Sequence, residues 1–142
     1  MEGFNMLKLT KKVEYALMSV VYISEQGNEQ LSSAKEIALA NSIPTEILAK
    51  TLQHLASLDI IESVKGPKGG YRIVGNINKI NIIDFIEMLE GPVGLTDCST
   101  YISCDQECSC KIKDPMAMIN DKIIGTLKKI TLDHFTKISE ER

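Results

Sequence analysis

Four cysteines lie close together in this 142-residue chain, at Cys98, Cys104, Cys108 and Cys110, and the chain has no other cysteine. Because reducing compartments keep thiols from forming disulfides, four thiols in one short segment indicate metal binding or redox sensing. Zinc sites usually carry cysteines in C-x2-C pairs, and that spacing is absent. Iron–sulfur clusters tolerate wider spacing on an irregular loop, which fits the C-x5-C-x5-C pattern of Cys98, Cys104 and Cys110. The segment favours an iron–sulfur cluster and leaves zinc open.

A catalytic role for such a cluster would require further sequence features. A cluster enzyme should carry a glycine-rich nucleotide loop or a catalytic acid and base pair, and the sequence shows neither. The C-x3-C-x2-C arrangement of radical enzymes is also missing, because the cysteine segment ends as C-x3-C-x-C. We therefore expect a protein that is not an enzyme.

The first half of the chain has the pattern of a helix-turn-helix. Hydrophobic residues at helical spacing predict helices over Lys11–Gln26, Ala34–Asn41 and Pro44 to about Leu58. Ser33 and Glu36 form a capping-box sequence before the second helix. In the third helix, the predicted buried side consists of Ile47, Leu48, Leu52, Leu55 and Leu58.

A predicted β-hairpin follows the third helix. Two β-prone runs, Ile60–Val64 and Tyr71–Val74, flank a basic, glycine-rich turn over residues 65–70. A helix-turn-helix followed by a hairpin is the winged-helix arrangement, in which the third helix enters the major groove of DNA and the wing contacts the backbone. The residues expected to contact DNA are Thr45, Glu46 and Lys50 on the helix and Lys65, Lys68, Gly69 and Arg72 on the wing.

The net charge of −3 does not by itself favour DNA binding. Lys, Arg, Asp and Glu are unevenly distributed, however: the net charge is +1 over residues 1–80 (nine basic against eight acidic), −5 over 81–114 (two against seven) and +1 over 115–142 (five against four). The acidic excess surrounds the cysteines, so the winged-helix part can still carry a locally basic face.

The second half predicts a dimerisation element. A helix is predicted over Ile80–Glu90, before the cysteine segment, and a long helix is predicted after Pro115. A last short helix is predicted to start within Thr131–Phe135. Apolar residues of the long helix recur with a period of 3.5 and indicate packing against a second copy; they are Met116, Ile119, Ile123, Leu127 and Ile130. The predicted fold is mainly α with a small β-hairpin wing: a DNA-binding domain over 7–80, a helix and cysteine loop over 81–114, and a dimerisation helix with tail over 115–139.

The chain contains five motifs in a fixed order: the opening Leu7–Thr10, the helix-turn-helix, the wing sequence over 65–71, the C-x5-C-x5-C loop and the closing Ile130–Leu132. In this order and spacing, they resemble the motifs of the Rrf-type winged-helix iron–sulfur regulators, which include IscR-like and NsrR-like proteins. The resemblance spans nearly the whole chain. It implies a homodimer that binds a palindromic DNA operator and holds a cluster on three cysteines. We expect a cytoplasmic transcriptional repressor that senses nitric oxide, redox state or cluster status, with no membrane partner.

The resemblance leaves two candidates for a fourth cluster ligand. IscR-like proteins place a histidine three residues after the last cysteine, where this chain has Lys113. NsrR-like proteins use a carboxylate from the first helix of the partner subunit, and Glu14 matches that position. Cys108, which the family pattern does not require, could replace Glu14 or Cys110 as a ligand. Three cysteines and one oxygen favour a 4Fe-4S cluster over a 2Fe-2S cluster. The alternatives that remain open are a zinc- or thiol-based winged-helix regulator and, less favoured, a small iron–sulfur enzyme.

Overall fold

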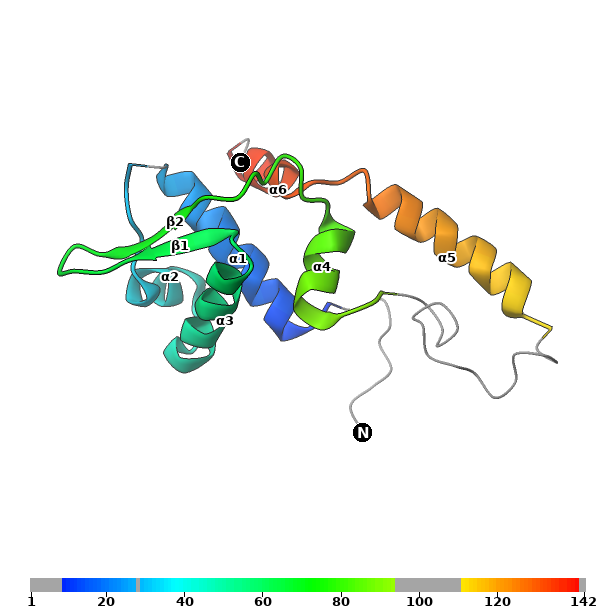
Figure 1. Cartoon of the computed structure of the whole chain (residues 1–142), viewed down its shortest axis with the longest axis horizontal. Helices are drawn as coiled ribbons and strands as arrows, with labels where there is room; N and C mark the ends of the chain where they lie inside the picture. The colour runs from blue at the N-terminus through cyan, green and yellow to red at the C-terminus, as the bar shows by residue number, and fades with distance from the viewer. Residues whose placement is uncertain (1–8, 28, 94–110, 141–142) are drawn as a thin grey trace.

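The computed structural model describes residues 9–27, 29–93 and 111–140, with side chains up to residue 137. The elements in chain order are α1 (Lys11–Gln26), α2 (Ala34–Asn41), α3 (Thr45–Ser57), β1 (Ile61–Val64), β2 (Gly70–Ile73), α4 (Ile82–Glu90), α5 (Lys113–Leu127) and α6 (Leu132–Glu140). The hairpin projects from one end of the molecule, and α5 extends from the opposite end (Figure 1). The predicted fold class, mainly α with a small hairpin wing, is confirmed.

The helix-turn-helix forms as predicted because each helix has a local start and stop signal. Ser33 and Glu36 cap the start of α2 reciprocally, with N–O distances of 3.1 and 3.4 Å. Ser42 then adopts a left-handed conformation, with φ of 54°, which ends α2. Pro44 precedes the first residue of α3, so the fixed φ of the proline directs the chain into the new helix.

One face of α3 packs into the core, although not with all the residues predicted. Leu48, Leu52 and Leu55 are fully buried. Ile47 was predicted to be buried and is 47% exposed, so that prediction was wrong. The fourth buried residue of the helix is Thr51, whose hydroxyl donates to the backbone oxygen of Ile47 at 2.9 Å and can therefore be buried at little cost. Ile47 lies about 100° of helix rotation from Leu48, at the edge of the buried face.

The hairpin pairs Ile61 with Ile73 and Val64 with Gly70 in antiparallel register, about one residue away from the predicted strand limits. Its second strand is also bonded to the segment before α2. The amide of Ser32 donates to the carbonyl of Tyr71 at 3.0 Å, and the amide of Tyr71 donates back at 2.8 Å. These bonds hold the base of the wing against the helix-turn-helix.

A single hydrophobic core joins α1, α2, α3, α4 and α6. Phe85 of α4 and Leu132 of α6 are fully buried in it. The segments before α4 and α6 are joined by backbone hydrogen bonds from Ile82 to Ile130 at 2.8 Å and from Leu132 to Ile80 at 2.9 Å. The C-terminal helix is thereby fixed to the winged-helix part of the chain.

The start of α6 is held by polar side chains. The backbone amide of Thr131 donates to Nδ1 of His134 at 3.0 Å, so His134 helps to cap the start of α6. Asp133 accepts from Lys137 at 2.8 Å and from the hydroxyl of Thr131. These two hydrogen bonds, that of Lys137 first, hold the pKa of Asp133 below its usual value.

Helix α5 begins at Lys113, three residues before its predicted first residue, Met116. Pro115 lies within its first turn, where a helix has no internal acceptor for the amide that proline lacks. No residue of α5 is buried, and Met118 and Ile119 are exposed. Its C-terminal end differs, because Ile124 and Leu127 pack against the core. The N-terminal part of the predicted apolar seam therefore faces away from the described chain.

Candidate nucleic-acid interface and the anchor of the cysteine segment

The three residues predicted to read DNA on α3 are all exposed. Glu46 and Lys50 lie on the side of the helix opposite the buried leucines, whereas Thr45, the first residue of α3, lies on the same side as Leu52. Glu46 lies in the first turn, where the helix dipole stabilises a carboxylate. The core therefore fixes this helix by one face and leaves the other available to a ligand of DNA dimensions.

The turn of the wing depends on glycine at two positions. Gly66 has a φ of +125°, which disfavours other residues. At Gly69, an added Cβ would lie 2.1 Å from the backbone oxygen of Val64. The amide of Gly69 closes the turn by donating to the carbonyl of Gly66 at 2.9 Å. This tight turn leaves Lys65 and Lys68 exposed, where their ammonium groups are accessible to a ligand such as a phosphate backbone.

Arg72 of the wing has a partner that the sequence reasoning missed. Its Nε donates to Oε1 of Glu62 on the neighbouring strand, and the two side chains are 46% and 40% exposed. A signal for this pair was available, because residues 62 and 72 are equally distant from Pro67 at the turn and therefore face each other across the hairpin. Glu62 neutralises part of the positive charge that the wing offers to DNA.

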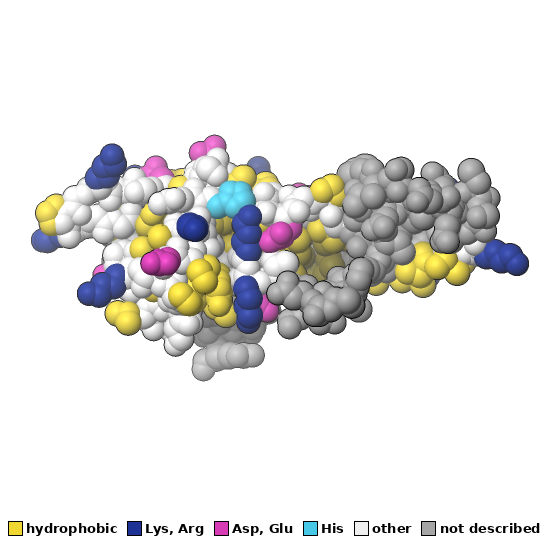
Figure 2. All heavy atoms as spheres, turned by 90° about the horizontal axis from the view of Figure 1, so that it is seen from below, with side chains coloured by type: hydrophobic (Ala, Val, Ile, Leu, Met, Phe, Trp, Pro, Cys, Tyr) yellow, Lys and Arg dark blue, Asp and Glu magenta, His cyan; other side chains and the backbone are white. Residues whose placement is uncertain are grey.

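A shallow groove lies between the first turn of α1 and one flank of α3. Its lining residues are Lys12, Ile47, Lys50, Thr51 and His54. Figure 2 views this side of the molecule and shows Lys and Arg side chains, a histidine and a hydrophobic patch close together. Nζ of Lys12 also donates to the backbone oxygen of Leu89, at 3.0 Å, so one residue contacts both the groove and the last turn of α4.

The four cysteines, Cys98, Cys104, Cys108 and Cys110, lie outside the described residues. The element that precedes them in the chain is described, and its end is bonded to the start of α1. The hydroxyl of Thr10 donates to Oε1 of Glu90 at 2.8 Å, beside the bond from Lys12 to Leu89. Thr10 also caps α1 by accepting from the amide of Val13 at 3.3 Å. The chain that leads into the cysteine segment is therefore tied to the first turn of α1.

Glu14 lies in this same first turn of α1. Its carboxylate accepts from Nζ of Lys11 at 3.0 Å, and its side chain is 30% exposed. This hydrogen bond is the main cause of a raised pKa at Lys11. Exposed ion pairs contribute little to stability, so the carboxylate can exchange Lys11 for another cation at small cost. Within the described residues no three His, Cys, Asp or Glu side chains gather into a metal site.

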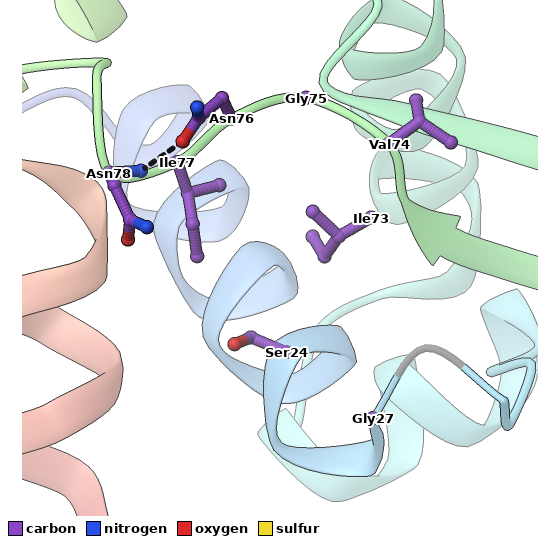
Figure 3. Close-up of a pocket in the computed structure, with 8 residues that line it drawn as sticks. All are labelled: Ser24, Gly27, Ile73, Val74, Gly75, Asn76, Ile77 and Asn78. Carbon is purple, nitrogen blue, oxygen red and sulfur yellow. Dashed lines mark hydrogen bonds between the residues drawn. The ribbon is translucent and has the colours of Figure 1, made fainter.

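A second hollow lies behind the wing, between β2, the segment that follows it and the last turn of α1 (Figure 3). Ile73 and Ile77 line it together with Ser24, Asn76 and Asn78. None of its lining residues carries an ionisable side chain. It therefore offers no acid, base or strong metal ligand, unlike the groove beside α3.

Comparison with known proteins identifies the family. Residues 9–138 match the model of the Rrf2 family, described as iron-dependent transcriptional regulators. The chain belongs to the Rrf2 family. BadM of Rhodopseudomonas palustris, which is named as an HTH-type transcriptional regulator, is 31% identical to this Rrf2-family chain over 132 residues. The match covers 93% of the chain and 83% of BadM.

One further relative in sequence and one solved structure are similar to this Rrf2-family chain. The HTH-type transcriptional regulator NsrR of Halalkalibacterium halodurans is 27% identical over 128 residues, covering 89% of the chain and 88% of NsrR. The solved structure of CymR, the global cysteine regulator of Bacillus subtilis, superposes with a TM-score of 0.75 at 22% identity, covering 92% and 97% of the two chains. The likeness to CymR establishes the winged-helix fold. The chain is thus a DNA-binding transcription regulator, and no helix in its described part could cross a membrane.

Proposed function

We propose that this chain is a homodimeric repressor whose affinity for DNA depends on an iron–sulfur cluster held by its cysteine segment. The observation that carries the proposal is the pair of hydrogen bonds from Thr10 and Lys12 to the last two residues of α4. These bonds connect the end of α4, which leads into the cysteine segment, with the start of α1, which packs against α3. A change in the cysteine segment can therefore displace the DNA-reading helix.

Each DNA-contact residue has a role that follows from its chemistry. Lys50, Lys65 and Lys68 supply positive charge for phosphates. Glu46 repels phosphate, so its value lies in accepting a hydrogen bond from the amino group of cytosine, and Thr45 can contact either a base or a phosphate. Replacing Glu46 with alanine should therefore relax specificity at one base pair per half-site, at a cost of about 1–3 kcal/mol.

The donor set of the cysteine segment suits a cluster. Cys98, Cys104 and Cys110 would supply three thiolates, and the fourth ligand would be Glu14 of the partner subunit or Cys108. The partly exposed carboxylate of Glu14, which is paired with the exposed Lys11, is compatible with that role. When bound, the cluster would supply iron that reacts with oxygen or nitric oxide, 4Fe-4S being favoured over 2Fe-2S. The family description, iron-dependent transcriptional regulator, supports this assignment.

We propose that α5 forms the dimer interface. Its exposed Met118 and Ile119 are large hydrophobic side chains on a helix with no buried residue. A two-fold symmetric dimer would present two α3 helices to half-sites about one DNA turn apart. In such a dimer, the resemblance to NsrR-like proteins implies that Glu14 of one subunit would be the fourth ligand to a cluster on the other.

The cofactor assignment is tested by anaerobic purification of the full-length protein, with iron, sulfide and zinc measured per chain. We expect a brown protein with thiolate-to-iron absorption, lost in Cys98→Ser, Cys104→Ser and Cys110→Ser. Comparing Glu14→Ala with Cys108→Ser identifies the fourth ligand, because only loss of a ligand should alter the spectrum and the oxygen sensitivity. A colourless protein with stoichiometric zinc, or without any metal, would replace the cluster by the zinc- or thiol-based alternative.

A further inference from the structure

We propose that Ile47 determines part of the operator sequence by packing against the 5-methyl group of a thymine in the major groove. This inference rests on the proposed DNA-binding function and deepens it. It assigns a base contact to a residue that was predicted to be buried in the core because of its hydrophobic side chain. It also extends the proposed DNA-contacting surface of α3 to the groove between α1 and α3.

The position of Ile47 supports a base contact. It is 47% exposed and lies between Glu46 and Lys50 along α3, near the N-terminal end of the helix. The N-terminal residues of a recognition helix are those that reach base edges. Its burial on the described chain is prevented by the rotation of the helix, which directs Leu48 and Thr51 to the core instead.

The surroundings of Ile47 indicate DNA as the occupant of the groove. Lys12, Lys50 and His54 line the groove with it, and none of the five lining residues is a carboxylate. An apolar group flanked by cations is complementary to a thymine methyl flanked by the phosphates of its strand. Lys12 can take part although it donates to Leu89, because an ammonium has three N–H donors.

The size of the effect follows from the group that is buried. Removing one methyl from water corresponds to about a fourfold change in affinity per half-site, and to about fifteenfold when both half-sites of a palindrome are changed. Uracil lacks only this methyl, so replacing a thymine with deoxyuridine removes the contact and leaves every hydrogen-bonding group of the base pair in place.

The test begins by selecting operators for the full-length, anaerobically purified protein from a random duplex pool. Deoxyuridine then replaces each thymine of the selected operator in turn, in both half-sites, and binding is measured for wild type, Ile47→Ala and Ile47→Val. Val74→Ala serves as the control, because Val74 is a similarly exposed aliphatic residue (48%) that lines the hollow behind the wing.

We expect one thymine position at which deoxyuridine weakens wild-type binding by about fifteenfold. Ile47→Ala should bind thymine and deoxyuridine operators equally there, Ile47→Val should retain part of the difference, and Val74→Ala should behave as wild type. The wild-type series and Ile47→Val carry the test if Ile47→Ala folds poorly.

The proposal is overturned if the wild type tolerates deoxyuridine everywhere, or if Ile47→Ala keeps the wild-type sensitivity. An unchanged deoxyuridine response with weakened dimerisation would instead assign Ile47 to a subunit contact and would equally overturn it. Failure to enrich any duplex would refute the proposed DNA-binding function itself, and the Ile47 contact with it.

Discussion

Replacing Thr10 with valine tests the connection between the cysteine segment and the DNA-reading helices. The substitution keeps the shape of the side chain and removes its hydroxyl. Two interactions are lost: the cap on α1, in which the hydroxyl accepts from the amide of Val13, and the bond to Glu90 at the end of α4. The bond from Lys12 to Leu89 remains, so the connection is weakened rather than abolished.

The loss of stability can be estimated from these two interactions. Loss of a threonine cap costs about 1 kcal/mol. The hydrogen bond to Glu90 is exposed and adds less than about 1 kcal/mol. The total, about 1–2 kcal/mol, should lower the melting temperature of a 142-residue chain by about 3–7 °C at fixed protein concentration.

The effect on regulation is separate from the effect on stability. Coupling between two sites is typically about 1–3 kcal/mol. Because Thr10 supplies one of the two hydrogen bonds between α1 and the end of α4, Thr10→Val should remove about half of the coupling. A 30-fold difference in DNA affinity between cluster-loaded and cluster-free protein would then fall to about fivefold.

The assay is anaerobic fluorescence anisotropy with a labelled operator duplex, performed on both cluster states of each variant. Thr10→Ser is the matched control, because serine keeps the hydroxyl and should retain both the cap and the wild-type ratio. If Thr10→Val lowers the melting temperature but leaves the ratio of the two affinities unchanged, α4 and α1 do not transmit the state of the cysteine segment.

Three further substitutions test other parts of the structure. Glu62→Gln should release Arg72 for a phosphate, tightening operator binding about two- to fivefold and steepening its salt dependence; unchanged affinity at low salt would contradict this. Gly69→Ala places a Cβ 2.1 Å from the Val64 oxygen, so we expect a loss of about 1–3 kcal/mol in unfolding free energy together with weaker DNA binding, whereas wild-type behaviour in both measurements would refute the tight turn. Asp133→Asn should lower the free energy of unfolding at neutral pH, because the ionised carboxylate is stabilised in the folded protein. The difference in free energy from wild type should vanish as the pH falls below 3.8 and through the lowered pKa of Asp133. A difference that persists at pH 2 in urea unfolding would argue against the hydrogen bonds assigned to Asp133.

The helices and the hairpin were predictable because their signals are local. The capping box of Ser33 and Glu36, the proline before α3 and the glycines of the wing act over a few residues, and each gave the element limits to within two residues. The early start of α5 was missed because proline is tolerated throughout the first helical turn, so Pro115 does not mark the first residue.

The features that were missed depend on tertiary packing. Periodicity places Ile47 at the edge of the buried face of α3, and the structure buries Thr51 rather than Ile47 on that edge. The contacts of Thr10 with Glu90 and of Lys12 with Leu89 join residues about 80 positions apart, which no local pattern indicates. The predicted DNA-contact residues other than Gly69 lie at exposed positions, and Gly69 is half-buried in the turn of the wing. DNA contact by these residues and the cluster ligands both remain predictions from the sequence.

The central claim is that the state of the cysteine segment controls DNA affinity. Its most direct test is the dissociation constant of the selected operator, measured anaerobically for cluster-loaded and cluster-free protein at the same salt concentration. We predict a difference of at least about fivefold, the lower limit of typical coupling. Equal dissociation constants for the two forms would contradict the account, even if both forms bound the operator tightly.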